Sequence, residues 1–149
     1  MRTGPLLAAL LALGVPSLAA AAEVIVVHRD PGCSCCEQWA AQIHQQFGRR
    51  VTLIDDRGRS TFRLAHGVPA RLVSCHTAIV DGMVFEGHVP ISDMKRVLAQ
   101  RPRGVQGLAV AGMPLGSPGM EVPGQRAQAF DVVAFGSGGE KVYAHHGPQ

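Results

Sequence analysis

The sequence predicts an α/β domain in which a central mixed sheet is flanked by helices. Short β-branched runs alternate along the chain with segments of helical period. Two extended runs are separated by Asp81-Gly82, which is a strong two-residue signal for a β-hairpin. A cluster of cysteines directly follows the first extended run. These features together set the expected order of the elements.

The first 22 residues are predicted to be an export signal. Arg2 is the only charged residue in this stretch, residues 6–13 form an apolar block, and residues 20–22 offer a small-residue cleavage site. The apolar block is shorter than the roughly 20 residues that a membrane span needs. We therefore expect a mature domain of residues 23–149 without a membrane span, periplasmic if the source is a Gram-negative bacterium. A retained N-terminal anchor is the alternative.

The composition of the mature chain fits one domain. The whole chain has 14 Lys and Arg against 11 Asp and Glu, so removing Arg2 leaves 13 against 11, a formal net charge of +2. The short basic segments 57–59 and 101–103 flank predicted helix ends and have no interleaved aromatic residues. We expect no nucleic-acid partner, and the 127 residues (149 minus 22) suit one modest core.

The N-terminal half predicts a strand, a cysteine-containing turn, a helix, a strand and a short helix. Residues 24–27 form a short β-branched run that Pro31-Gly32 ends. Apolar residues recur every fourth position within 36–47, which predicts a helix that stops at Gly48. A second strand is predicted at 51–54, and Ser60 is the expected cap of a short helix through residue 66.

The C-terminal half predicts a hairpin, a helix, a long loop and a second hairpin. The first hairpin spans 78–86, and a helix capped by Ser92 should end near Gln100. Residues 107–120 show neither helical nor strand period and are rich in glycine and proline, which predicts a loop that is either functional or mobile. Two extended runs within 130–144 predict a second hairpin added to the edge of the sheet.

This order of elements is that of the thioredoxin-like fold. The Cys-x-x-Cys pair formed by Cys33 and Cys36, between a strand and a helix, supports the assignment. In that fold the loop that enters the first hairpin lies against the cysteine turn. Here the loop holds Cys75 and His76, so we expect both beside the cysteine cluster. Thioredoxins carry a cis-proline just before this strand, whereas this chain has His76 there.

Four thiols are therefore expected at one place, on Cys33, Cys35, Cys36 and Cys75. Thiolates at a helix N-terminus are favoured, and soft thiolates select Cu(I), Zn(II) or iron–sulfur clusters. The single-residue spacing does not follow ferredoxin patterns, and three crowded sulfurs suit several bridged metals better than one tetrahedral ion. We favour a multi-copper thiolate cluster. Zinc bound by three cysteines and His76 is the chemical alternative, and structural disulfides are the alternative without metal.

Further candidate ligands have weaker support from the sequence. Met113 and Met120 are candidate thioether donors to Cu(I), with ordinary packing of their loop as the alternative. His88 follows the first hairpin, and its position alone favours a surface residue over a metal ligand. His28, at the end of the first strand, is equally compatible with either role. For the pair 145–146 a frayed terminus is favoured over a metal-binding tail.

Four segments carry a family resemblance: His28–Trp39, Ser74–Gly82, Glu86–Pro90 and Gly112–Glu121. In this order they resemble the CopG-type copper-resistance family, small periplasmic metal-binding proteins otherwise described as a domain of unknown function. The resemblance covers nearly the whole mature chain. One departure is Gly32, where many relatives carry threonine before the first cysteine; this loosens the turn without removing a ligand.

The resemblance implies a thioredoxin-like fold that holds copper ions, and a role in copper tolerance through binding and interconversion of Cu(I) and Cu(II). Other periplasmic copper-handling proteins would be its partners. Residue by residue, it implies that Cys33, Cys35, Cys36 and Cys75 are the bridging ligands. His76 belongs to the family's cysteine–histidine motif, and His88 to its Gly-His-Val-Pro motif. Met113 and Met120 match the family's methionine loop.

Three functions follow from these observations. The preferred one is a periplasmic copper-binding protein, which would be a copper oxidoreductase if it turns over. The second is a thiol–disulfide oxidoreductase with Cys33 as nucleophile and Cys36 as resolving thiol. The third is a zinc-stabilised structural module that recognises a protein partner. Cys35 argues against the second function, because a third thiol between the pair invites internal scrambling.

Overall fold

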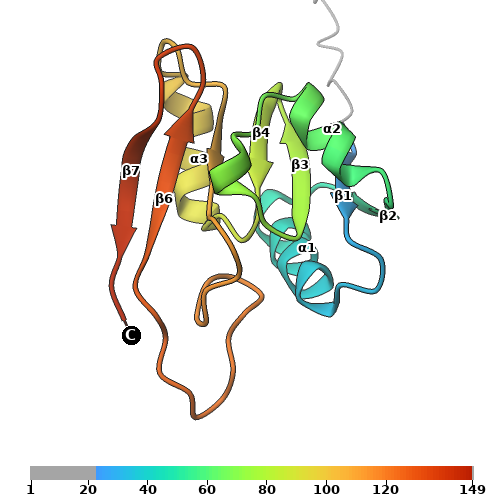
Figure 1. The fold of residues 1–149 in the computed structure, drawn as a ribbon. Helices are drawn as coiled ribbons and strands as arrows, with labels where there is room; N and C mark the ends of the chain where they lie inside the picture. The colour runs from blue at the N-terminus through green and yellow to red at the C-terminus, as the bar shows by residue number, and fades with distance from the viewer. Residues whose placement is uncertain (1–22, 149) are drawn as a thin grey trace, which may run out of the picture.

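The computed structural model describes residues 23–148, and the predicted export signal at 1–22 lies outside them. The described residues form one seven-stranded sheet and three α-helices (Figure 1). The helices are α1 (Ser34–Phe47), α2 (Arg59–Ala65) and α3 (Ile91–Gln100), and a 3-10 turn spans Ala70–Leu72. The strands are β1 (Ile25–Arg29), β2 (Val51–Asp55), β3 (His76–Val80), β4 (Met83–Glu86), β5 (Gly107–Ala109), β6 (Phe130–Phe135) and β7 (Lys141–His146).

The sheet is mixed, as the sequence predicts, and its strand order is β2-β1-β3-β4-β5-β6-β7. β1 pairs in parallel with β2 and antiparallel with β3, and β4 pairs in parallel with β5. The remaining neighbours are antiparallel. β7 lies at one edge beside β6, with an irregularity between Val132 and Val133. Residues 145–146 therefore belong to an edge strand, so the expectation of a frayed terminus is wrong.

Each face of the sheet has its own hydrophobic core. Successive side chains of a strand point to opposite faces, so β4, β5 and β6 contribute to both cores. On one face α1 and α3 pack against each other and against the larger core cluster, which includes Trp39, Ile43, Phe85 and Met94. On the other face a smaller cluster joins Val84 and its neighbours to residues that follow α2. Figure 1 shows how these layers sandwich the central strands.

The predicted hairpin forms with the expected two-residue turn. Val80 and Met83 are paired across β3 and β4, and Asp81 and Gly82 have φ angles of 48° and 78°. Both residues therefore adopt the left-handed conformation that this turn requires, which a Gly and an acidic residue tolerate. The register that follows from the turn determines which residues of β3 and β4 face each core.

The helices lie where they are predicted, but the predicted caps Ser60 and Ser92 are wrong, because both lie inside helices whose N-caps are Gly58 and Pro90. α1 begins at Ser34, with Cys33 as its N-cap, so it starts earlier than expected and takes Cys35 and Cys36 into its first turn. Its end is as predicted, since Gly48 adopts φ 64° and its N–H donates to the carbonyl of His44. None of the helices within 23–148 is long and apolar enough to cross a bilayer.

The predicted loop over 107–120 is partly wrong, because its first three residues form strand β5. All three are buried, and they pair with β4 on one side and β6 on the other. Gly-Leu-Ala has low intrinsic strand preference, so only its two neighbouring strands make this segment extended. The rest of the segment, from residue 110 onward, has neither helix nor strand.

We predict that Gly107→Ala destabilises the fold. A Cβ atom at this position would lie 2.1 Å from the carbonyl oxygen of Val84 and 2.7 Å from the Phe135 ring. Because Val84 is fixed by its own strand pairing, the free energy of unfolding should fall by about 1–3 kcal/mol or more, measured by urea denaturation. Gly147→Ala, where a Cβ atom meets nothing, is the control and should change it by less than about 0.5 kcal/mol. Equal midpoints for both variants would contradict this account.

Candidate metal centre

The cysteine turn joins the end of β1 to the start of α1. Its tight path is fixed by a hydrogen bond from the N–H of Cys33 to the carbonyl of Asp30, 3.1 Å, and by Gly32 at φ 74°. Cys33 and Cys35 are half-buried, whereas Cys36 is fully buried. The three sulfur atoms therefore lie at the N-terminal end of a 14-residue helix, where its dipole favours negative charge.

Cys75 reaches this turn through the pairing of β1 with β3. Arg29 is the register partner of His76, and the N–H of Asp30 donates to the carbonyl of Cys75 at 3.0 Å. The Sγ atom of Cys75 lies 3.4 Å from that of Cys36. All four sulfur atoms lie within 4.8 Å of one another, so the predicted convergence of the thiols is confirmed.

Two of the four sulfurs are joined in this structure. Cys33 and Cys36 form a disulfide across a Cα–Cα distance of 5.4 Å, whereas Cys35 and Cys75 are thiols. A pair three residues apart at a helix start has the spacing that a disulfide needs. The Sγ atom of Cys35 lies 3.4 Å from that of Cys33, so both thiols touch the disulfide. The structure thus presents a two-electron-oxidised form of the expected four-thiol cluster.

Two histidines extend the cluster on its buried side. His76 Nδ1 lies 3.5 Å and His88 Nε2 lies 3.1 Å from the Sγ atom of Cys75, and all three residues are buried. The surface position favoured for His88 is wrong, because its side chain is completely covered. A tetrahedral ion with one sulfur and two nitrogen ligands needs sulfur-to-nitrogen separations of about 3.5 Å, from usual bond lengths of about 2.3 and 2.0 Å. The chemistry and spacing of this set suit a soft metal ion.

The orientation of His88 is fixed by a backbone group. Its Nδ1 atom donates to the carbonyl of Pro118 at 2.8 Å. In a neutral imidazole this leaves a lone pair on Nε2, directed at Cys75. A histidine whose other nitrogen is held in this way is the usual arrangement at metal sites. No sequence pattern predicts this contact, because the acceptor is a backbone carbonyl 30 residues away.

Burial keeps these groups uncharged while no cation is bound. It raises the pKa of Cys75 to about 12, with the negative charge of Cys35 adding to the effect. Burial also lowers the pKa of His76 well below its usual value, with the neighbouring His88 contributing, and lowers the pKa of His88. His76 Nε2 is a buried polar atom without a hydrogen-bond partner. A bound metal cation would lower the pKa of Cys75 again, because it stabilises the thiolate.

The methionine loop packs along the start of α1. A Cβ atom at Gly119 would lie 2.7 Å from both the carbonyl oxygen of Cys35 and the backbone nitrogen of Trp39, so the loop and the helix are in direct contact. Met120, the next residue, is half-buried, whereas Met113 is 52% exposed. The structure thus brings Gly119 of the loop against the start of α1, while the side chain of Met113 is open to solvent.

His28 is occupied by other contacts. Its Nδ1 atom lies 2.9 Å from a carboxylate oxygen of Asp56, and its ring stacks on Phe62 at 3.7 Å between centroids. These partners place the imidazole on the face of the sheet that α2 covers. His28 is therefore not among the described residues that gather around the sulfurs.

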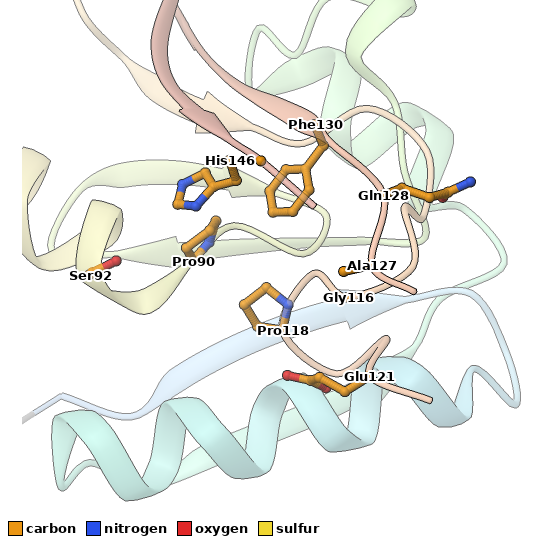
Figure 2. Close-up of a pocket in the computed structure, with 10 residues that line it drawn as sticks. Pro90, Ser92, Gly116, Pro118, Glu121, Ala127, Gln128, Phe130 and His146 are labelled. Carbon is orange, nitrogen blue, oxygen red and sulfur yellow. The ribbon is translucent and has the colours of Figure 1, made fainter. Parts of the chain in front are cut away.

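A cavity of about 300 Å³ lies beyond the methionine loop (Figure 2). Its walls include Pro118, Glu121, Phe130 and His146. His146 stacks on Phe130, and its Nε2 atom lies 2.7 Å from a carboxylate oxygen of Asp93. Pro118 lines this cavity and its carbonyl accepts from His88, so the cavity adjoins the cluster, but neither His88 nor a cysteine lines it.

Comparison with known proteins is consistent with this geometry. A family model described as a protein of unknown function, DUF411, matches residues 72–120, which contain Cys75, His76 and His88. No curated protein matches the chain. Two solved structures, named copper resistance protein CopG form 1 and form 2, are each 37% identical and superpose with TM-scores of 0.74 and 0.73. Each comparison covers 83% of this chain and 97% of the other. This chain is therefore a member of the CopG family of copper resistance proteins.

Proposed function

We propose that the mature chain is a periplasmic protein that binds several copper ions on its four cysteines and interconverts Cu(I) and Cu(II). The observation that carries the proposal is the gathering of four sulfur atoms within 4.8 Å, each contributed by a residue at or near the cysteine turn. Thiolates are soft ligands that select Cu(I), and one sulfur can bridge two ions. The names of the two related structures support copper as the metal.

The proposed redox step uses the pair that forms the disulfide. Cys33 and Cys36 as thiolates give one electron each to two Cu(II) ions, which yields two Cu(I) ions and the Cys33–Cys36 disulfide. Cys35, Cys75 and His88 keep their donor atoms in this form and would hold the Cu(I) produced. The reverse reaction oxidises two Cu(I) ions, whose two electrons break the disulfide and restore the two thiolates. Met120 and Met113 are the further candidate donors, and His76 is the candidate on the buried side.

The fold and the cell compartment are part of the same proposal. We infer a thioredoxin-like unit formed by β1 to β4 with α1 and α3, extended by β5 and by a C-terminal hairpin of β6 and β7. The position of the disulfide between β1 and α1 supports this assignment. The signal-like sequence at 1–22 supports export, and copper-handling proteins of the same compartment are the proposed partners.

The first test is an anaerobic titration of the fully reduced mature chain with Cu(I). We expect several copper ions per chain, and fewer and more weakly bound ions after Cys75→Ala, since this residue supplies the sulfur that joins the turn to the two histidines. Copper content after desalting and competition with a Cu(I) chelator are the measurements. His145→Ala removes an exposed histidine in β7 and should bind as the parent does. Substoichiometric binding that is equal in the parent and in Cys75→Ala would refute the cluster.

The redox step predicts that the reduced chain converts Cu(II) to Cu(I) without added reductant. Anaerobic mixing should form about two Cu(I) ions per disulfide, as two electrons require, with the disulfide mapped to Cys33 and Cys36 by mass spectrometry. Cys36→Ser should lose that disulfide and reduce Cu(II) much more slowly, because Cys33 then has no partner sulfur with which to form the disulfide. An unchanged rate and yield in Cys36→Ser would rule out the proposed electron donor.

A second candidate function is thiol–disulfide exchange with protein substrates. The disulfide itself favours it, since Cys33 is half-exposed at a helix N-terminus and Cys36 is buried behind it. That is the arrangement of an attacking and a resolving thiol. The contact of Cys35 with Cys33 opposes it, because the third thiol offers an internal target for exchange.

Reduction of insulin disulfides separates the two candidates. Under the copper proposal we expect little activity in the parent, and Cys35→Ser should lose copper without becoming an efficient exchange catalyst. Ser34→Ala is the control, because it changes a neighbouring exposed residue that has no thiol. Efficient insulin reduction that rises on removal of Cys35, in protein that binds no copper, would favour exchange.

A further inference from the structure

Arg59 is a buried charged residue close to the cysteine cluster, and the chemistry above does not use it. It is the first residue of α2, is 3% exposed and is the only fully buried residue of that helix. Burying a guanidinium costs free energy unless its N–H groups are hydrogen-bonded and its charge is paired. The partners of Arg59 therefore show what its burial holds in place. They come from three separate segments of the chain.

The guanidinium joins the two segments that carry the sulfurs. On the side of the cysteine turn, Nε and Nη2 of Arg59 donate to the two carboxylate oxygens of Asp30 at 2.8 and 3.1 Å. On the other side, Nη2 donates to the carbonyl of Ser74, the residue before Cys75. Asp30 is also the residue whose backbone bonds to both Cys33 and Cys75. One side chain therefore ties together both halves of the cluster.

Glu86 completes the arrangement from β4. Nη1 of Arg59 lies 3.3 Å from Glu86 Oε1, which also accepts from the N–H of Ser74 at 2.7 Å. The other carboxylate oxygen of Glu86 accepts from the hydroxyl of Thr77. The residues on both sides of Cys75 and His76 are therefore held by the Arg59–Glu86 pair. Glu86 is fully buried, so this pair is shielded from solvent.

We propose that Arg59 is a positioning residue for the copper cluster, which fixes Cys75 against the cysteine turn so that the sulfurs are assembled before metal arrives. The inference rests on the proposed copper function and identifies how its site is organised. Only an arginine fits the role, because its planar guanidinium donates to three partners at once. Two donors bind the carboxylate of Asp30, and the others bind the carbonyl of Ser74 and the carboxylate of Glu86. A lysine supplies the charge but cannot make these contacts together.

The test compares Arg59→Lys and Asp30→Asn with the parent chain. The side chain of Asp30 is half-exposed, so Asp30→Asn is expected to fold. It therefore keeps the test valid even if the change at the buried Arg59 unfolds the protein. Arg49→Lys is the matched control, because Arg49 is a mostly buried arginine that pairs with Asp81 elsewhere in the structure. Each variant is measured below its melting temperature for Cu(I) affinity by chelator competition and for the Cu(I)–thiolate absorption band. The alkylation rate of Cys75 in the metal-free disulfide form is measured by mass spectrometry.

We expect Cu(I) affinity to fall by about 10- to 100-fold in Arg59→Lys and Asp30→Asn, the usual effect of losing a residue that orients metal ligands. The absorption band should shift and Cys75 should be alkylated faster in both variants, whereas Arg49→Lys should match the parent. Parent-like affinity and alkylation in both variants, or an equal loss in Arg49→Lys, would overturn the role of Arg59. If the parent itself binds no Cu(I), the proposed function fails, and the alkylation rates alone decide the positioning role.

Discussion

The antiparallel pairing of β1 with β3 is the constraint on which the metal centre depends. It sets Arg29 opposite His76, and so delivers Cys75 to the turn that follows β1. A shift of this register by one residue would turn the side chains of β3 to the opposite face of the sheet. The buried residues of β3 would then lose their core, which is why packing and sulfur geometry depend on the same pairing.

Much of the fold could be predicted because its signals are local. The cysteine turn lies between a β-branched run and a helix with clear apolar spacing, and Asp81-Gly82 sets the first hairpin. The meeting of Cys75 with the turn followed from topology alone. β5 could not be found in this way, since its three residues are extended only because two strands enclose them.

The inner half of the site was harder to predict because it depends on contacts distant in sequence. The burial of His88 follows from the methionine loop, whose Pro118 carbonyl reaches its ring. The charged group around Arg59 joins residues from a turn, a helix and a strand, and no spacing in the sequence connects them. The disulfide between Cys33 and Cys36 is a matter of oxidation state, which residue order does not determine.

The hydrogen bond between His88 and Pro118 has a consequence for what accompanies metal uptake. Because the ring is already neutral, with its proton on the nitrogen that faces the loop, it accepts a cation without giving up hydrogen. The thiols, in contrast, must each lose one to become ligands. Hydrogen ions released on loading therefore originate from protonated thiols, and acidification of an unbuffered solution counts the thiols that become ligands.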